Sequence, residues 1–418
     1  MVEAIRQGNG MHWTQTPAYK RIAIFVALMF LLTGIVRGIN FPNLWTYTNY
    51  LLPCTSFFVK RNAIGCIVET IGIIDFFQYE VFVYYSFIIL FIFWLTLTLK
   101  TITTISKGEF AALSGTLVFC IGLAPIYLSN ISGYFDFLGA LLVLLSISIT
   151  SFRLKLLVTT LGFIFLVFVH EAILVIFLPL AVVDLCMIAH ETDEKLRGKR
   201  LWFVGGMGGS LLSLALLVAN SSIDTGTAKD LLGLAQEKTS IPLSSGVFDI
   251  FSRDISDSRG LMLWFIEQVL LLPENGGLKS IVLYIMRFLL GALIITHLNF
   301  IMARYIYGSK LIAAVVSLAP LSALLLLFVA YDIIRWAAWA TACSFCLYMI
   351  LCARGGTAAL YSLRISLVLI VLFALSQAAV EIPLLAPRED RPVVSSAASY
   401  IHGILTGTSP ISPSRPRY

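Results

Sequence analysis

Charged residues are scarce in this sequence, and their scarcity limits the class of protein. Asp, Glu, Lys and Arg make up 12% of the 418 residues, hydrophobic residues make up 59%, and the mean hydropathy is +0.91. In an ordinary soluble domain about a quarter of the residues are charged. Apolar runs of roughly 20 residues, long enough to cross a bilayer, recur along nearly the whole chain. We therefore expect an all-α, polytopic integral membrane protein without a separate soluble domain.

Motifs for metals, nucleotides and nucleic acids are also missing. A His-Glu-x-x-His zinc motif after His170 would need a second histidine at position 174, where the sequence has leucine. The cysteines lack metal-ligand spacing, and Cys343 and Cys346, which form Cys-x-x-Cys, lie in an apolar stretch. The glycines of 205–209 open an apolar helix and predict close helix packing. Basic residues are dispersed among the loops, so we expect no metal, no cofactor and no nucleic-acid partner.

What the chain does contain is eleven apolar runs, which we predict to be transmembrane helices. They cover 22–36, 81–99, 110–128, 135–150, 156–169, 172–188, 201–219, 279–300, 311–330, 336–352 and 365–380. Lys and Arg concentrate in alternate connections, which predicts an N-terminus inside and a C-terminus outside. The predicted organisation is a cytoplasmic N-terminal segment (1–21), a transmembrane domain (22–380) with external loops at 37–80 and 220–278, and a disordered external tail (381–418).

The first external loop carries two cysteines, Cys54 and Cys66. A disulfide between them would suit an external, oxidising location. The sequence alone leaves open whether the bond forms.

Residues 156–188 are apolar but too long for one ordinary crossing, since a single helix would measure about 50 Å against a hydrocarbon core of about 30 Å. One solution is two helices that meet near His170, and the other is one long helix with a buried His170-Glu171 pair. Two crossings keep the later Lys and Arg residues inside, so we favour two. The stretch 167–175 has no Gly, Pro or Asn to form a turn, so a kink within the membrane is the alternative.

Five ionisable residues are predicted at the outer ends of these spans: Asp136, His170, Glu171, Asp332 and Arg335. Each has an ordinary structural explanation as a helix cap or an interfacial anchor. Asp332 and Arg335 are three residues apart, so they would share a helical face and could pair. Because all five face one side of the membrane, we predict that they form one functional site.

An outward-facing histidine with carboxylates and an arginine suits transfer of a group from a membrane-anchored donor. We assign catalysis to His170, Glu171, Asp136 and Asp332, with His170 as a general base, and we expect Arg335 to neutralise a polyprenyl diphosphate leaving group. The external loops would hold the sugar chain. Aromatic residues there suit stacking on sugar rings, although each is equally explained as an interfacial anchor: Trp45, Tyr47, Tyr50 and Trp264.

The layout resembles the bacterial polysaccharide polymerases of the Wzy and EpsG type, which include O-antigen, capsule and exopolysaccharide polymerases. The resemblance rests on about eleven spans, on a late external loop with arginines (253–260, RDISDSRG), and on His170 near the outer end of a mid-chain helix. It implies a glycosyltransferase in the bacterial inner membrane that joins polyprenyl-diphosphate-linked oligosaccharides at the outer face. It also implies substrate binding by Arg253 and Arg259, contact with membrane lipid, and partners in a polysaccharide-assembly complex.

Two other classes of function stay open. A transporter or flippase for lipid-linked sugars or another polar solute would also span the membrane many times, but it should carry polar residues through the middle of its spans, and few are found. A lipid-modifying acyltransferase could also use an outer histidine. The sequence does not select a sugar, a lipid or a linkage.

Overall fold

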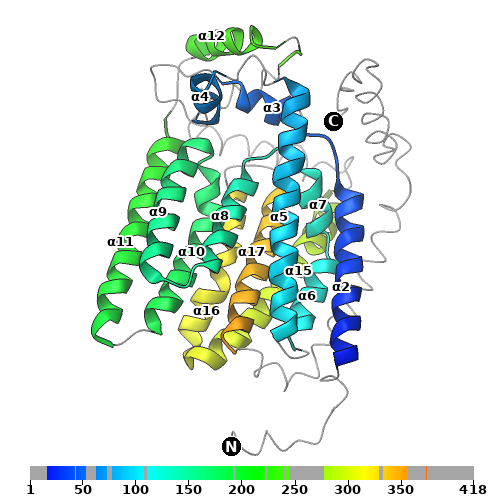
Figure 1. The fold of residues 1–418 in the computed structure, drawn as a ribbon, viewed down its shortest axis with the longest axis vertical. Helices are drawn as coiled ribbons and strands as arrows, with labels where there is room; N and C mark the ends of the chain where they lie inside the picture. The colour runs from blue at the N-terminus through cyan, green and yellow to red at the C-terminus, as the bar shows by residue number, and fades with distance from the viewer. Residues whose placement is uncertain are drawn as a thin grey trace, which may run out of the picture.

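The protein forms a bundle of helices, seen in a computed structural model that describes residues 17–42, 44–52, 63–72, 78–107, 111–191, 194–221, 225–239, 241–243, 277–328, 333–355 and 373. All regular structure within those residues is helical. The bundle contains α2 (Pro17–Gly38), α5 (Tyr79–Lys107), α6 (Ala111–Ile121), α7 (Ala124–Asn130), α8 (Asp136–Ser148), α9 (Phe152–Val169), α10 (Ala172–His190), α11 (Glu194–Ala219), α15 (Gly277–Tyr307), α16 (Lys310–Leu318), the 3₁₀ segment η5 (Ala319–Phe328) and α17 (Ile333–Ala353). Three short helices, α3 (Leu44–Tyr50), α4 (Ala63–Thr70) and α12 (Thr225–Gln236), lie across one end of the bundle (Figure 1). We call these three helices the cap.

The predicted membrane class is confirmed by the length and composition of these helices. Six of them are long and apolar enough to cross a bilayer, or seven if α6 and α7, which bend by 50° at their junction, form one span. Ten of the eleven predicted spans coincide with a helix or with two successive segments. The eleventh, 365–380, lies outside the described residues apart from Phe373. The count of eleven crossings and their orientation remain predictions.

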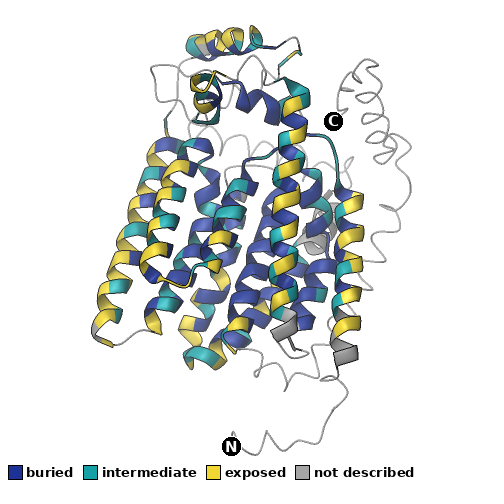
Figure 2. Cartoon of the chain, viewed as in Figure 1, coloured by how far each residue is buried: buried dark blue, intermediate teal, exposed yellow. Residues whose placement is uncertain are grey.

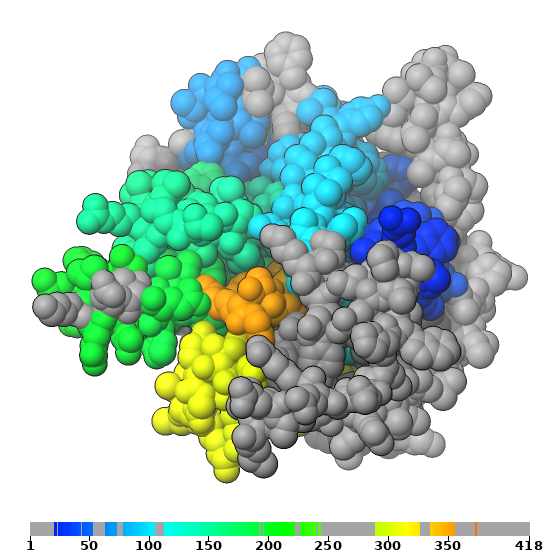
Figure 3. Space-filling model, turned by 60° about the horizontal axis from the view of Figure 1, so that its bottom comes forward, coloured from blue at the N-terminus to red at the C-terminus, as the bar shows by residue number. Residues whose placement is uncertain are grey.

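The core of the bundle surrounds α17. In the most apolar stretch of α17, 94% of the residues are buried, against 22% in that of α11. Helix α17 is therefore central and α11 peripheral (Figure 2). Figure 3 views the bundle obliquely from the end away from the cap. In this view α17 (orange) has the green helices on one side and the yellow ones on another. A central helix contacts several neighbours at once, and polar side chains on it can therefore meet partners from different helices.

The chain breaks at His170, as the two-crossing interpretation predicts. Helix α9 ends at Val169, His170 is extended at φ −165° and ψ 110°, and α10 begins at Ala172. The break needs no glycine or proline because an extended φ near −165° is accessible to any residue. The two helices then pack side by side (Figure 1), which places His170 and Glu171 at the end of the bundle that carries the cap.

The glycines of α11 do not pack closely against the described part of the chain, contrary to the sequence prediction. A Cβ atom built on Gly205, Gly206 or Gly209 meets no atom within 4 Å. Close packing occurs instead at Gly38 of α2, where such an atom would lie 1.9 Å from the Ile126 carbonyl oxygen of α7. Glycines at other helix contacts are also tightly packed: a Cβ atom on Gly115 of α6 would lie 2.6 Å from Tyr348 of α17, and one on Gly162 of α9 would lie 2.5 Å from Leu142 of α8.

Candidate functional site

Asp136 and Arg335 form a buried ion pair at the cap end of the bundle. The Arg335 side chain donates from Nε to Asp136 Oδ2 over 2.6 Å and from Nη2 to Oδ1 over 2.8 Å. Asp136 is the first residue of α8 and is fully buried, and Arg335 is 7% exposed in the first turn of α17. Two parallel N–H to oxygen bonds between charged groups give both strength and a fixed orientation. The pair therefore joins α8 to α17 in one geometry.

Aromatic groups complete the surroundings of this pair. Trp339, one helical turn after Arg335, donates its indole N–H to Asp136 Oδ2 over 2.9 Å. The Asp136 carboxylate thus receives three N–H donors. The Arg335 guanidinium carbon lies 4.4 Å from the ring centre of Tyr134 and 4.5 Å from that of Trp336, which places the cation over both rings. These contacts satisfy a buried charge that would otherwise be costly in the membrane.

His170 is the third ionisable member of the cluster, from the break between α9 and α10. Its Nε2 lies 3.4 Å from Arg335 Nη2, and its Nδ1 lies 3.2 Å from the backbone nitrogen of Ala172. Glu171 places a carboxylate oxygen 3.7 Å from Nδ1. His170 is 7% exposed. Three helical regions far apart in the sequence therefore bring Asp136, His170 and Arg335 together, with Glu171 beside them, as the sequence predicted for these four.

The turn before α8 sets the position of Asp136. Gly133 adopts φ +86°, where a side chain would be strained, and a Cβ there would come within 2.9 Å of Pro42 and 2.8 Å of Phe82. Ser132 donates to the Asn40 carbonyl over 2.6 Å. These contacts hold the turn against the segment that follows α2, so that α8 begins at a fixed point.

The cap is connected to this turn through an aromatic cluster. The Tyr50 hydroxyl donates to the Gly133 carbonyl over 3.2 Å, and its ring lies 4.6 Å from that of Phe135. Phe135 in turn meets the His170 ring edge-on at 6.4 Å. Burial raises the pKa of Tyr47 and raises that of Tyr50 well above its usual value, so both phenols stay neutral.

The expectation that Tyr47 and Tyr50 stack on sugar rings is wrong. Their exposed fractions are 0% and 2% because both rings pack against other aromatic rings. Tyr47 contacts Tyr79 and Phe82, and Tyr50 contacts Phe82. Trp45 is only partly buried, and Trp264 lies outside the described residues. The alternation of aromatic and polar residues in the first loop gave no means of telling a buried cluster from an exposed one.

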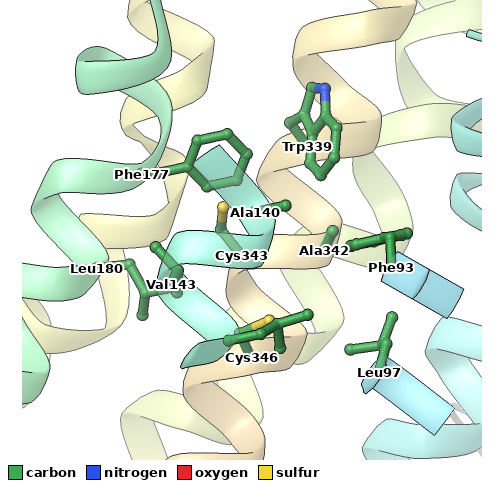
Figure 4. Close-up of a pocket in the computed structure, with 11 residues that line it drawn as sticks. Phe93, Leu97, Ala140, Val143, Phe177, Leu180, Trp339, Ala342, Cys343 and Cys346 are labelled. Atoms are coloured by element: carbon green, nitrogen blue, oxygen red, sulfur yellow. The ribbon is translucent and has the colours of Figure 1, made fainter. Parts of the chain in front are cut away.

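Below the cluster the protein interior is apolar. A cavity of about 10 Å³ lies between α5, α8, α10 and α17, and Trp339, Phe177, Phe93 and Cys343 are among its lining residues (Figure 4). Such a volume is at the lower limit for one water molecule, and an apolar lining offers water no hydrogen bonds. The Trp339 ring separates this dry space from the Asp136 carboxylate that its N–H contacts.

A second polar cluster, which sequence reasoning missed, lies at the other end of α10 and α17. Lys155 of α9 pairs with Asp184 of α10 at 2.5 Å, with side chains 2% and 4% exposed. Arg354, directly after α17, contacts Asp184 at 3.4 Å and Glu191 at 2.7 Å. Lys155 directly precedes the predicted span 156–169, but α9 begins at Phe152 and includes it. An aspartate alone in an apolar run was the available signal that a cation must lie nearby.

Other predicted site residues cannot be placed in the same way. Asp332, Arg253 and Arg259 lie outside the described residues. The predicted contact of Arg335 with Asp332 therefore stays a prediction, and the structure adds Asp136 as a partner of Arg335. Trp339 was also missed, although its spacing of four residues from Arg335 places both on one face of α17.

A metal site is not formed in the part of the chain that the structure describes, since no group of three or more His, Cys, Asp or Glu residues there could hold an ion. In the segment predicted as the first external loop, Cys66 is disulfide-bonded and the five other described cysteines are free. Its predicted partner, Cys54, lies outside the described residues. Comparison of the chain with protein-family models, with curated proteins and with solved structures finds no match.

Proposed function

We propose that this protein is a membrane glycosyltransferase that joins lipid-linked oligosaccharide units at the outer face of a bacterial inner membrane, a polysaccharide polymerase. The observation that supports the proposal most is the meeting at one buried point of Asp136 from α8, Arg335 from α17 and His170 from the break between α9 and α10. Ionisable groups inside a membrane protein are costly, so a cluster assembled from distant segments indicates a function beyond anchoring.

The charges of the cluster suit a base that gains a proton. Asp136 and Arg335 neutralise each other, and Glu171 adds one negative charge beside a neutral His170. Glu171, with a carboxylate oxygen 3.7 Å from Nδ1, would balance the positive charge of a protonated imidazole. A general base of this kind contributes about 10²- to 10⁴-fold in rate.

The proposed reaction is displacement at the anomeric carbon of a lipid-linked donor. Nε2 of His170 removes the proton of an acceptor sugar hydroxyl, and the oxygen forms a bond to the anomeric carbon. The bond from that carbon to the diphosphate oxygen breaks, and polyprenyl diphosphate leaves with the electron pair. The products are a lengthened glycan and the released lipid diphosphate.

The role of Arg335 in this proposal is narrower than the sequence suggested. Two of its N–H groups are used by Asp136 and its charge is compensated there, so Arg335 and Asp136 act as a positioning pair for His170. Neutralising a diphosphate needs further cations. Arg253 and Arg259 of the late external loop remain the proposed groups for it, and Asp332 remains a proposed member of the site.

A reconstituted assay tests the proposal. The purified protein in nanodiscs receives a polyprenyl-diphosphate-linked oligosaccharide as its only substrate, and the products are separated by electrophoresis. The proposal predicts a ladder of longer glycans together with released polyprenyl diphosphate. Unchanged oligosaccharide would contradict it.

A transporter or flippase is the second candidate, and the Lys155–Asp184–Arg354 cluster favours it. Polar clusters at both ends of α10 and α17 are what a carrier with two gates would need, and the sequence alone had offered few polar residues within the spans. The same lipid-linked oligosaccharide in sealed vesicles distinguishes the candidates. Movement across the bilayer without a change in length would favour the carrier.

A further inference from the structure

We propose that an anionic phospholipid binds where the first turns of α9 and α11 meet, at the end of the bundle away from the cap. Arg153, Arg197 and Lys199 would hold its phosphate. Three features of this junction support the proposal: the helix starts lie together, their cations have no acidic partners, and apolar side chains are exposed beside them. The proposal depends neither on glycan transfer nor on the side of the membrane that this end faces.

Helices α9 and α11 both begin at this end of the bundle and pack against each other (Figure 1). The Arg200 guanidinium of α11 lies 4.8 Å from the ring centre of Phe152, the first residue of α9. Phe152 and Val204 also share a small apolar cluster that joins α9, α10 and α11. Arg153 follows Phe152 directly, and Arg197 lies three residues before Arg200 on one face of α11. The cations of the two helices therefore project from adjacent first turns.

Three of these cations have no acidic partner among the residues that the structure describes. Arg153, Arg197 and Lys199 form no side-chain hydrogen bond or ion pair there, and the Nε of Arg197 is buried without a hydrogen-bond partner. Glu194, in the first turn of α11, is exposed and forms no ion pair with them, and Glu191 is bound at 2.7 Å by the arginine that follows α17. Like charges that lie close together repel one another, so an anion bound between them would stabilise the junction.

Large apolar side chains of the same two helices face outward beside these cations. Trp202 is 78% exposed, and Leu154, Leu157 and Phe203 are exposed as well. Trp202 lies about 8 Å beyond Arg197 along the helix axis, and tryptophan prefers the boundary between headgroups and acyl chains. The cations therefore lie at the depth of lipid phosphates. A phospholipid can place its phosphate on the cations and its acyl chains on the apolar face, which a free phosphate in water cannot do.

The net charge of the headgroup decides which phospholipid this surface prefers. Arginine binds phosphate oxygens through two parallel N–H groups, and a lysine ammonium adds a third donor. In phosphatidylcholine the choline compensates the phosphate, whereas phosphatidylglycerol keeps a net negative charge. A basic residue close to an anionic membrane surface raises the affinity about fivefold. The junction should therefore select phosphatidylglycerol over phosphatidylcholine.

Quenching of tryptophan fluorescence by brominated lipid tests the proposal. The full chain is placed in phosphatidylcholine nanodiscs that contain a series of mole fractions of one brominated lipid, either phosphatidylglycerol or phosphatidylcholine. The chain has seven tryptophans, so the signal of Trp202 is the difference between the wild type and Trp202→Phe. Phosphatidylglycerol should quench that signal at a mole fraction at least about fivefold lower than phosphatidylcholine does. High salt should reduce the difference.

Two triple variants separate a site at this junction from a general attraction of lipid to a basic end. The junction variant, with Arg153→Gln, Arg197→Gln and Lys199→Gln, should lose the preference for phosphatidylglycerol. The matched control removes three exposed cations at the same end of the bundle from other helices, through Arg21→Gln, Arg304→Gln and Lys310→Gln. The control should keep the preference.

Equal quenching by the two lipids in the wild type would overturn the proposal, and so would an unchanged preference in the junction variant. Loss of the preference in the control variant would overturn it too, because the whole basic end would then attract anionic lipid without a site at this junction. Circular dichroism of each variant shows whether the helices are kept.

Discussion

Arg335 holds Asp136 through two N–H bonds of 2.6 and 2.8 Å, although 199 residues separate them. Neither side chain is more than 8% exposed. A single substitution therefore leaves a charge buried without its partner, and that costs about 3–5 kcal/mol. Double replacement of a buried pair by apolar residues of similar size is often close to neutral.

For this pair we predict that Asp136→Leu and Arg335→Met each lower the free energy of unfolding by about 3–5 kcal/mol and that the double variant recovers most of the loss. Denaturant titration in detergent micelles, with α-helical circular dichroism as the signal, measures all three. Additive losses in the double variant would show that the two groups do not interact.

The Lys155–Asp184 pair allows the same comparison at the other end of the bundle. Lys155→Met should destabilise by about 3–5 kcal/mol, because Asp184 would keep only its longer contact with Arg354. The matched control is Lys238→Met, which breaks a pair with the more exposed Glu69 and should cost about 0–1 kcal/mol. Equal effects of the two variants would contradict the burial argument.

Glycines at helix contacts give a steric prediction. Gly38→Ala should destabilise strongly, since a Cβ there would lie 1.9 Å from a backbone oxygen of α7 that cannot move alone. Gly206→Ala in α11 should be neutral or slightly stabilising, because no described atom lies within 4 Å and alanine favours helix. Melting temperatures in one detergent compare the two. A similar loss in both would mean that α11 packs against something else.

The disulfide can be counted by mass spectrometry. The sequence has seven cysteines and five are free, so alkylation of the denatured protein should block five before reduction and seven after it (7 − 5 = 2 in the bond). In the chain-entropy model a ring of about a dozen residues contributes about 3 kcal/mol. Seven blocked thiols without reductant would remove the bond.

Orientation is open to labelling with an impermeant thiol reagent. In a background without the five free cysteines, a cysteine at Asp230 of α12 should react from outside, and one at Arg304 of α15 should react only after the membrane is opened. Both positions are exposed in the structure, so burial does not explain a failure to react. The reverse pattern would invert the predicted topology.

Much of this fold could be predicted because hydrophobic runs and the distribution of Lys and Arg are local properties of a sequence. The two helices on either side of His170 are an example, since span length and loop charge indicated them without a turn signal. Partners were harder to predict. Spacing along one helix suggested Asp332 as a partner for Arg335, and that contact stays a prediction, whereas the pair with Asp136 of another helix depends on packing that no local pattern shows. Lys155 was missed because the apolar run begins one residue after it.

A comparison of two histidines near opposite ends of α10 tests most directly whether His170 is a catalytic base. His170 lies in the cluster, in the break just before α10, and His190 is the last residue of α10 at the opposite end, beside Tyr307. Polysaccharide from cells with His170→Gln or His190→Gln, at matched protein level, is resolved by length on a gel. If His170 is the base, the first strain should accumulate single repeat units and the second should make long chains. Long chains from the His170→Gln strain would contradict the central claim that His170 is the base for glycan transfer.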